Sequence, residues 1–308
     1  MVNYNPFKQE CKWFKGNLHC HSTNSDGILS PSEIAGIYKV RGWDFLAFTE
    51  HGLYTDNHEF NDESFLIIPG IELDAYNPDP GRIYHIVGIG AANAGGNGFE
   101  HGDRFPGAAW EGMKTAQSLI DALTAQNNLA VFCHPVWSRL EFDDFKDLHG
   151  FFAVELFNNG CELENHTGLC VNYWDSLLRR GKRVWGVAVD DAHHRLKDQC
   201  GGWVMVNAPE LEHEAIIDAL VEGRFYASNG PEIHHYEIKD GEVAIECSPV
   251  KAVHFITYEN HGFSCWGEGG GTIRNARHKL SGEEKYVRVE CEDLYGRTAW
   301  TNPVFISG

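Results

Sequence analysis

Near the start of the chain, residues 16–27 read GNLHCHSTNSDG and contain three side chains that commonly bind metal ions. His19 and His21 are separated by one residue, so on a β-strand their imidazoles point to the same face. Asp26 follows in the turn before a helix that we expect to open at Pro31, which places a carboxylate just beyond the strand. A histidine-rich strand edge would explain this stretch by itself. Similar ligands further along the chain would instead indicate a divalent metal at a strand end.

The composition favours a small-molecule partner. The chain has 308 residues, 43% of them hydrophobic, and a formal net charge of −19. Because it has no basic run to neutralise phosphates, we expect neither nucleic acid nor an anionic membrane as a partner. Nine cysteines without a Cys-x-x-Cys pair favour free thiols in a reducing compartment. No window approaches the roughly 18 apolar residues of a membrane span, so we predict a cytoplasmic protein.

Short apolar runs alternate with helical patterns from residue 17 to residue 189, which is typical of a βα-repeating fold. Ser30, Pro31 and Glu33 form a helix-start pattern, and Gly42 ends that helix. Only residues 77–82 separate the third and fourth strands, so the repeat must be irregular there, and a hairpin is one solution. We predict an α/β fold, a distorted (βα)7 barrel, with strands at 17–20, 43–48, 65–73, 83–89, 129–133, 152–157 and 184–189.

The pattern changes near Pro231. Helices are expected at 110–126, 172–180 and 210–222, and the Gly-rich segment 91–107 is interpreted as an active-site loop or lid. Beyond Pro231 the runs alternate at strand period with Gly and Asp turns. We therefore predict two domains, an α/β barrel at 1–230 and a small all-β sandwich-like domain at 231–308.

Metal-ligating side chains recur at the ends of six of the seven predicted strands. Glu72 interrupts an otherwise apolar strand, which is costly for a buried carboxylate unless it is paired or bound to a metal. Each residue alone has a structural explanation, such as a satisfied core histidine or a buried ion pair. Because the C-terminal ends of barrel strands gather on one face, together they predict one site with nine metal ligands: His19, His21, Asp26, His51, Glu72, His85, His134, Asp191 and His193.

Nine nitrogen and oxygen ligands are too many for one ion and suit two or three divalent ions with a bridging carboxylate. Imidazole-rich ligand sets favour zinc, manganese or iron over magnesium or calcium, which prefer oxygen ligands. Such ions would leave the site locally cationic despite the acidic surface. The expected partner is therefore a small anionic substrate, most naturally a phosphorylated molecule.

The ligand segments LHCHS with SDG, TEH, GIE, CHP and DAH resemble the PHP (polymerase and histidinol phosphatase) superfamily over residues 16–230. The resemblance implies a distorted (βα)7 barrel and a trinuclear metal site that hydrolyses phosphoesters. It also implies three ligand groups, which are His19, His21, Glu72 and Asp191; Glu72, His85 and His134; and Asp26, His51 and His193.

Two positions depart from the family pattern. Glu50 stands where the family commonly has aspartate, and Asp190 stands where a small residue is usual. Segments 202–231 and 299–303 resemble a carbaryl-hydrolase-like branch, which has a C-terminal β-domain and includes carbamate-ester hydrolases. In these segments, Arg224, Tyr226 and Trp300 are expected to pack the joint between the domains.

The leading hypothesis is a metal-dependent phosphoesterase in which a metal-bridging hydroxide attacks the substrate. His193 or His194 is the candidate leaving-group acid. Arg139 and Arg195, each just beyond a ligand segment, are candidate phosphate-binding residues, with solvated surface arginines as the alternative. A carboxyl- or carbamate-ester hydrolase on the same site and a non-catalytic, metal-braced binding module are the competing hypotheses. The predicted catalytic residues are Glu72, Asp191 and His193.

Overall fold

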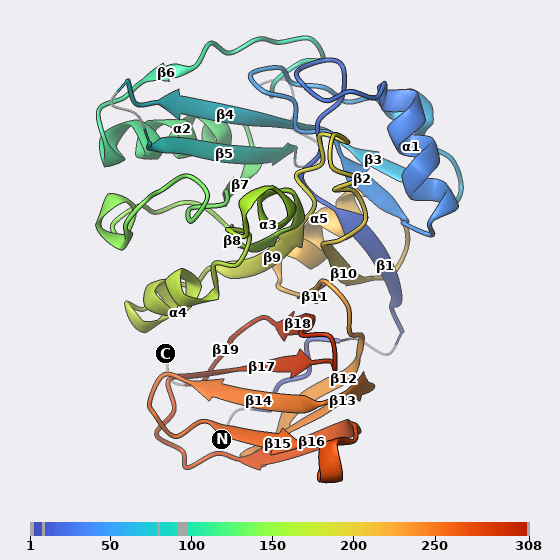
Figure 1. Cartoon of the computed structure of the whole chain (residues 1–308), viewed down its shortest axis with the longest axis vertical. Helices are drawn as coiled ribbons and strands as arrows, with labels where there is room; N and C mark the ends of the chain where they lie inside the picture. Colours follow the sequence, from blue (N-terminus) through green and yellow to red (C-terminus); the bar gives the residue numbers. More distant parts are fainter. Residues whose placement is uncertain (1–2, 8–9, 79–80, 91–97, 307–308) are drawn as a thin grey trace.

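The computed structural model describes residues 3–7, 10–78, 81–90 and 98–306. Figure 1 shows an α/β part, coloured blue to yellow, above an all-strand part coloured orange to red. The mixed α/β class is therefore confirmed. In the part of the chain that the structure describes, no helix has both the length and the apolar character needed to cross a membrane.

A ten-stranded sheet runs through both parts in the order β15-β14-β17-β18-β11-β10-β1-β2-β3, with β19 beside β17. β1, β2 and β3 are parallel, whereas β10 is antiparallel to both β1 and β11. The strand bounds are β1 Lys12–Asn17, β2 Phe45–Ala47, β3 Leu66–Ile68, β10 Trp203–Ala208, β11 Phe225–Ser228, β14 Ala252–Thr257, β15 Phe263–Trp266, β17 Tyr286–Glu292, β18 Thr298–Thr301 and β19 Val304–Phe305.

A six-stranded sheet has the order β6-β4-β5-β7-β8-β9. β4 and β5 form the hairpin that the short 77–82 segment suggested, and β5 is also antiparallel to β7, whereas β7, β8 and β9 are parallel. The predicted βα repeat is thus interrupted by antiparallel pairs, and a closed (βα)7 barrel stays a prediction. The bounds are β4 Gly70–Tyr76, β5 Ile83–Gly90, β6 Ala108–Ala109, β7 Asn128–Phe132, β8 Ala153–Asn158 and β9 Trp185–Val189.

The single strand predicted at 65–73 is wrong, because the chain changes sheets within it. β3 ends at Ile68 and β4 begins at Gly70, so Pro69 separates the two. Proline has no N–H to donate to a sheet ladder. A Cβ on Gly70 would lie 2.7 Å from the Phe48 carbonyl oxygen, so glycine is required at this crossing. The crossing sends β4, with Glu72 inside it, into the second sheet.

The predicted helices form close to their expected bounds. α1 has both halves of the predicted capping box, since the Ser30 side chain accepts from Glu33 N and the Glu33 carboxylate accepts from Ser30 N. Gly42 follows α1 with a φ of +78°, a conformation that suits glycine. The helices are α1 Pro31–Val40, α2 Met113–Ala125, α3 Asn159–Asn165, α4 Val171–Arg179 and α5 His213–Val221, with short 3-10 turns η1 His58–Phe60, η2 Phe142–Asp144 and η3 Glu268–Gly270.

In the all-strand part, a three-stranded sheet of β12 Ile233–Lys239, β13 Glu242–Val250 and β16 Ile273–Lys279 faces the C-terminal strands of the long sheet. Val243 and Ile245 of one sheet share a buried core with Val287 and Val289 of the other. The N-terminal segment joins this part, since Tyr4 pairs with Ile238 and Phe7 enters the same core. Figure 1 accordingly shows the N-terminus beside the orange strands.

Two of the three residues expected at the joint, Tyr226 and Trp300, make contacts across it. Buried Tyr226 enters the all-strand core, whereas buried Arg224 donates to the Asn207 carbonyl at 2.8 Å, a contact within residues 1–230. The Trp300 ring lies 6.2 Å from Phe157 of β8 in a stacked arrangement. The fully buried Arg288 of β17 binds Asp175 of α4 through two hydrogen bonds of 2.8–2.9 Å. The division at residue 230 nevertheless stays a prediction, because β11 and β18 pair across it.

A chain ending at residue 230 tests that division. We expect it to aggregate, or to unfold at a lower temperature than the full chain. Its loss of β18 uncovers the hydrogen-bonding edge of β11, and bare sheet edges promote association. Size-exclusion chromatography and thermal unfolding measure the outcome. A monomeric 1–230 chain with the full-length Tm would show instead that the two predicted domains fold independently.

Candidate metal centre

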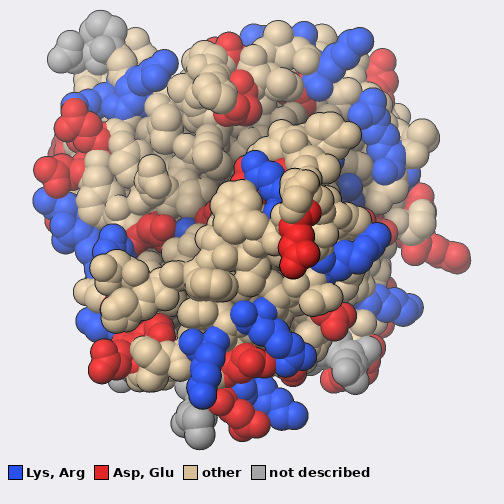
Figure 2. All heavy atoms as spheres, turned by 60° about the horizontal axis from the view of Figure 1, so that its bottom comes forward, with Lys and Arg blue, Asp and Glu red and all other residues tan. Residues whose placement is uncertain are grey.

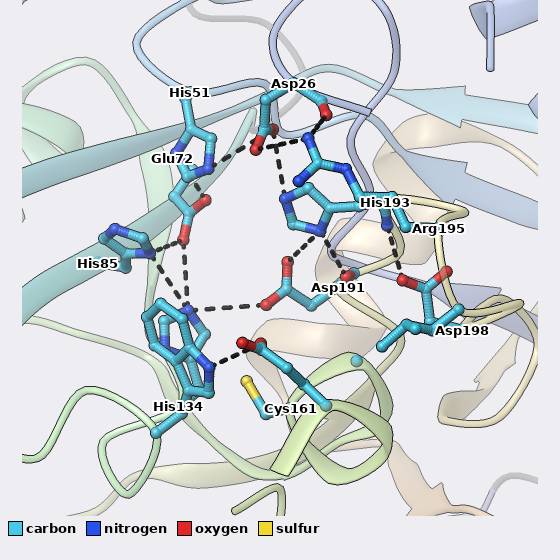
Figure 3. A pocket seen from close by; sticks show the side chains of 14 residues that line it. Asp26, His51, Glu72, His85, His134, Cys161, Asp191, His193, Arg195 and Asp198 are labelled. Carbon is cyan, nitrogen blue, oxygen red and sulfur yellow. Dashed lines mark hydrogen bonds and ion pairs between the residues drawn. The ribbon is translucent and has the colours of Figure 1, made fainter. Parts of the chain in front are cut away.

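The nine predicted ligands converge on one cavity of about 410 Å³ (Figure 3). Seven of them line this cavity, and the other two, His19 and His21, are fully buried against Glu72 and Asp191. The six segments that supply the nine residues come from both sheets and from the loops that follow their strands. The structure therefore assembles the whole set that the sequence proposed.

The prediction of a strand at 17–20, with His19 inside it, is wrong, because His19 and His21 both lie after the end of β1. β1 ends at Asn17, and Cys20 then makes a parallel bridge to Ala192. The two imidazoles still point to the same side, as a spacing of two residues predicts, since their Nε2 atoms lie 3.1 Å apart. The buried Asn17 side chain fixes the segment by donating to the His19 carbonyl and accepting from the Asp190 N–H, both at 2.9 Å.

Glu72 occupies the centre of the cluster and is only 1% exposed. Its Oε2 lies 3.3 Å from His19 Nε2, 3.2 Å from His21 Nε2 and 3.1 Å from His51 Nδ1. Its Oε1 lies 2.9 Å from His85 Nδ1 and 3.6 Å from His134 Nε2. Each carboxylate oxygen thus faces a different group of imidazoles.

Asp191, in the loop after β9, contacts His19 and His21, two of the imidazoles that face Glu72 Oε2. Its Oδ1 lies 3.2 Å from both His19 Nε2 and His21 Nε2, and its Oδ2 accepts from Asn158 Nδ2 at 3.1 Å. Asp191 and His134 have positive φ values of 50° and 24°. Such conformations cost about 1–3 kcal/mol each and concentrate at functional sites.

A third group forms nearer the solvent. Asp26 Oδ1 lies 3.2 Å from His193 Nε2 and 3.8 Å from His51 Nε2 (Figure 3). Asp26 is 45% exposed, and His51 and His193 are about a quarter exposed. This group is therefore the most accessible of the three.

Hydrogen bonds on the outer nitrogens orient two of the imidazoles. His19 Nδ1 lies 2.6 Å from Glu155 Oε1, and His193 Nδ1 lies 3.1 Å from the Asp191 carbonyl oxygen. Both partners accept hydrogen bonds, so Nδ1 carries the proton in each neutral ring. The lone pair is then on Nε2, which faces the cluster in both cases. This is the tautomer that a metal-binding histidine requires.

The pKa shifts differ between the buried members of the cluster and the more exposed His51. Burial would raise the pKa of the Glu72 carboxyl, but His85, His19 and His51 outweigh it and hold the pKa well below its ordinary value. Burial opposes protonation of His21, yet the adjacent Asp191 and Glu72 carboxylates raise its pKa to about 10. Burial lowers the pKa of His51 to about 4, so this ring is neutral at pH 7.

The residues fit divalent metal ions. Both Glu72 oxygens are buried and have no hydrogen-bond partner of acceptable geometry among the described residues, and such orphaned groups need an explanation. Five separations among His19, His21, Glu72 and Asp191 ligand atoms are 3.1–3.3 Å. Two donors on one tetrahedral ion with bonds of about 2.0–2.1 Å lie about 3.3 Å apart. Six imidazoles with three carboxylates suit zinc, manganese or iron.

Glu155 is a site residue that the sequence reasoning missed. It lies inside β8 and is 1% exposed. Its Oε1 pairs with His19, while its Oε2 accepts from the His134 N–H at 3.0 Å and from Asn158 Nδ2 at 2.9 Å. The signal was available, because a carboxylate interrupts the apolar run AVELF just as Glu72 interrupts its own strand. Glu155 thus orients two predicted ligands from behind.

The two departures from the family pattern also lie behind the ligands. Buried Glu50 accepts from the Ser22 N–H at 3.1 Å and from the hydroxyls of Ser22 and Ser25, which shapes the turn that carries Asp26. Asp190 is fully buried and accepts from the Tyr38 hydroxyl and from three successive N–H groups, those of residues 200–202. Burial raises the pKa of Asp190 to about 6 against these hydrogen bonds.

The two predicted substrate-binding arginines and the two candidate leaving-group acids divide into two groups. Arg195 and His193 line the cavity, and the Arg195 guanidinium donates to the Asp26 carbonyl. Arg139 is exposed and is not among the lining residues, so its predicted role finds no support in this cavity. His194 is buried with its Nε2 3.9 Å from Cys20 Sγ and is also not among the lining residues.

The predicted lid covers residues 91–107, of which 91–97 lie outside the described residues. The described remainder is anchored to the segment after His51. Tyr54 N–H donates to the Asp103 carbonyl, and Phe105 N–H donates to the Gly52 carbonyl. Phe99 packs on Tyr54 and Phe105. No residue of 98–107 lines the cavity. The Phe99 and Phe105 rings therefore hold the loop in place and do not contact this cavity.

Comparisons with known proteins show a similar fold. No family model matches the chain. Among solved structures, a two-domain Bacteroides vulgatus protein "containing predicted PHP-like metal-dependent phosphoesterase" superposes with a TM-score of 0.50, covering 94% of each chain at 14% identity. The chain therefore has the PHP-like fold that the ligand segments suggested. The carbaryl-hydrolase-like branch stays a prediction.

Curated relatives match only locally. The chain is 37% identical over 79 residues to a 5'-3' exoribonuclease of Haemophilus influenzae, covering 24% of this chain and 28% of that protein. It is 36% identical over 78 residues to the phosphoribosyl 1,2-cyclic phosphate 1,2-diphosphodiesterase of Eggerthella lenta, covering 24% and 30%. The chain thus spans less than a third of either relative.

The first prediction from this geometry concerns metal content. We expect two to three divalent ions per chain, because the nine residues form three groups that share Glu72 or adjoin it. Elemental analysis of protein purified without chelators measures the number. One ion or none at full occupancy would contradict it.

A second prediction contrasts the two strand carboxylates. Glu72→Gln should lower metal content by more than one ion, because a neutral amide bridges poorly between the two imidazole groups. Glu155→Gln, the matched control, keeps all nine ligands and should lower metal affinity only about 10–100-fold, as loss of an orienting partner does. Calorimetric titration of both variants with zinc gives the two numbers. Equal metal loss in both variants would contradict a bridging role for Glu72.

Proposed function

We propose that the chain is a metal-dependent phosphoesterase that acts on a small phosphorylated molecule. The observation that carries the proposal is the buried Glu72 carboxylate, whose two oxygens face separate imidazole groups beside an open cavity. The PHP-like fold supports it by analogy. The local matches to an exoribonuclease and to a cyclic phosphate diphosphodiesterase, both of which act on phosphoesters, add further support.

The proposed ligand groups follow the observed contacts. His19, His21, Glu72 and Asp191 would hold one ion, Glu72 with His85 and His134 a second, and Asp26 with His51 and His193 a third. When bound, such ions supply an activated water and positive charge for the oxygens of a phosphoryl group. Cytoplasmic localisation and the absence of nucleic-acid partners stay predictions of the sequence.

The chain's own residues prepare the site in three ways. Glu72, His19 and His21 are at most 1% exposed, so the inner wall excludes water and strengthens electrostatic interactions. Glu155 and the Asp191 carbonyl hold the His19 and His193 rings with Nε2 turned inward. Of the two histidines proposed as a leaving-group acid, His193 lines the cavity and His194 does not. Because the Nε2 of His193 is assigned to the third ion and its Nδ1 to the Asp191 carbonyl, its proposed contribution is that of a ligand and not of a free acid.

An assay with three ester classes tests the function. Protein loaded with zinc or manganese should hydrolyse p-nitrophenyl phosphate or its bis-ester, with turnover lost on chelation. p-Nitrophenyl acetate is the comparison that detects the alternative carboxyl- or carbamate-ester activity on the same site. Asp191→Asn, which alters the first ligand group, should lower kcat by at least 100-fold. Turnover of the acetate alone would favour the alternative, and no turnover with any substrate and either metal would favour a binding module.

A further inference from the structure

The outer half of the metal cavity differs in character from the inner half. The inner half is formed by the predicted ligands. The outer half is formed by side chains that the metal centre does not use, which are Trp137, Cys161, Glu164, Arg195, Leu196 and Asp198. A substrate whose phosphoryl group lies against the ligands must place its alcohol portion here. The charge and shape of this half therefore bear on substrate choice.

Trp137 forms an apolar wall beside the ligands. Its ring lies 5.1 Å from the His134 ring and 6.1 Å from the His85 ring, measured between centroids. Its one N–H donates to Glu164 Oε2 at 2.9 Å. Because that donor is already used, the indole offers a substrate only its π-surface. Leu196, 53% exposed although apolar, adds a second hydrophobic surface at the mouth.

The charges of the outer half favour cations. Asp198 is buried, and its oxygens accept from the backbone N–H groups of His193 and His194, which are neutral donors that leave the carboxylate charge in place. Glu164 adds a second carboxylate. Arg195 is the cation on this wall, but its guanidinium donates to the Asp26 carbonyl and lies 3.8 Å from the Asp26 carboxylate (Figure 3). The outer half thus carries two carboxylates, Glu164 and Asp198, while its one arginine is directed at Asp26.

Charged side chains on the face drawn in Figure 2 do not form a competing anion site. On the face of the molecule shown in Figure 2, Lys and Arg are interspersed with Asp and Glu rather than gathered into a broad basic patch. The formal charge of the whole chain is −19. A second phosphate or carboxylate on the substrate would meet repulsion in the outer half and little attraction beyond it.

We propose that the outer half of the cavity selects phosphoesters whose alcohol portion is neutral or cationic, and disfavours those with a second anionic group. The inference rests on the proposed phosphoesterase function and names its substrate class. Glu164 attracts a cation and repels an anion through the same Coulomb interaction, and the Trp137 π-face acts in the same direction. Glu164 is solvent-exposed, so its effect is several-fold rather than thousand-fold.

Binding of three matched phenylphosphonates tests the proposal without requiring turnover. The ring carries hydrogen, trimethylammonium or carboxylate at the para position, and calorimetry with metal-loaded protein measures each Kd. We expect the trimethylammonium compound to bind the native chain at least about tenfold more tightly than the carboxylate compound. Glu164→Gln, which keeps an oxygen for the Trp137 N–H, should reduce this ratio at least threefold and leave the unsubstituted compound unchanged within twofold.

Two ring variants separate the wall from the charge. Trp137→Leu should weaken all three compounds, and the trimethylammonium compound most, because that compound also loses the cation–π contact. Trp137→Phe should retain most of its binding. Metal content is measured in each variant and should not change. A native chain that binds the three compounds equally, or a Glu164→Gln variant with an unaltered ratio, would overturn the proposal.

The corresponding phenyl phosphates, assayed in parallel, keep this inference distinct from the function. Selective phosphonate binding without turnover of any phosphate ester would contradict the phosphoesterase and support the charge selectivity. Turnover of all three esters together with equal binding of the three phosphonates would support the phosphoesterase and contradict the charge selectivity.

Discussion

The burial of the Glu72 carboxylate is the constraint on which the rest of the molecule depends. A carboxylate that is 1% exposed carries a desolvation cost of several kcal/mol unless positive charge surrounds it. Five imidazoles lie within 3.6 Å of its two oxygens. These rings come from four segments that are distant in the sequence, so the fold has to bring both sheets to one point. Removing any one segment would leave the charge less compensated.

The crossing at Pro69 and Gly70 is how the chain meets this constraint. Residues before the crossing extend the long sheet beside β2, and residues after it form β4 beside β5. Glu72 is therefore placed where the loops after β1 and β2 meet the strand that carries His85. Loops following β7 and β9 bring His134 and Asp191 from the other side. The antiparallel β4–β5 pair, which interrupts the βα repeat, is thus the feature that places Glu72 beside the His85 strand.

The sequence predicted which residues gather at one place better than it predicted the strands, and their role as metal ligands stays a prediction. Most of the nine residues follow predicted strands, and Glu72 and His85 interrupt apolar strands, which are both local signals. The division of 65–73 into two strands depends on a close approach of Gly70 to Phe48, which only the folded chain reveals. Arg139 was proposed from its nearness in sequence to His134, but the loop directs it to solvent. Glu155 was missed although its pattern matches that of Glu72, because a single interrupting carboxylate does not say whether it faces the cluster.

The two departures from the family pattern affect the scaffold around the ligands more than the ligands themselves. Glu50 is one methylene longer than aspartate, and its carboxylate accepts from Ser22 and Ser25 in the segment that carries Asp26. Asp190 gathers three N–H groups of residues 200–202, which closes the loop that begins at Asp191. That loop carries Arg195, Leu196 and Asp198, which line the outer half of the cavity. A substitution at position 190 is therefore expected to alter the loop that lines the cavity without replacing any of the nine predicted ligands.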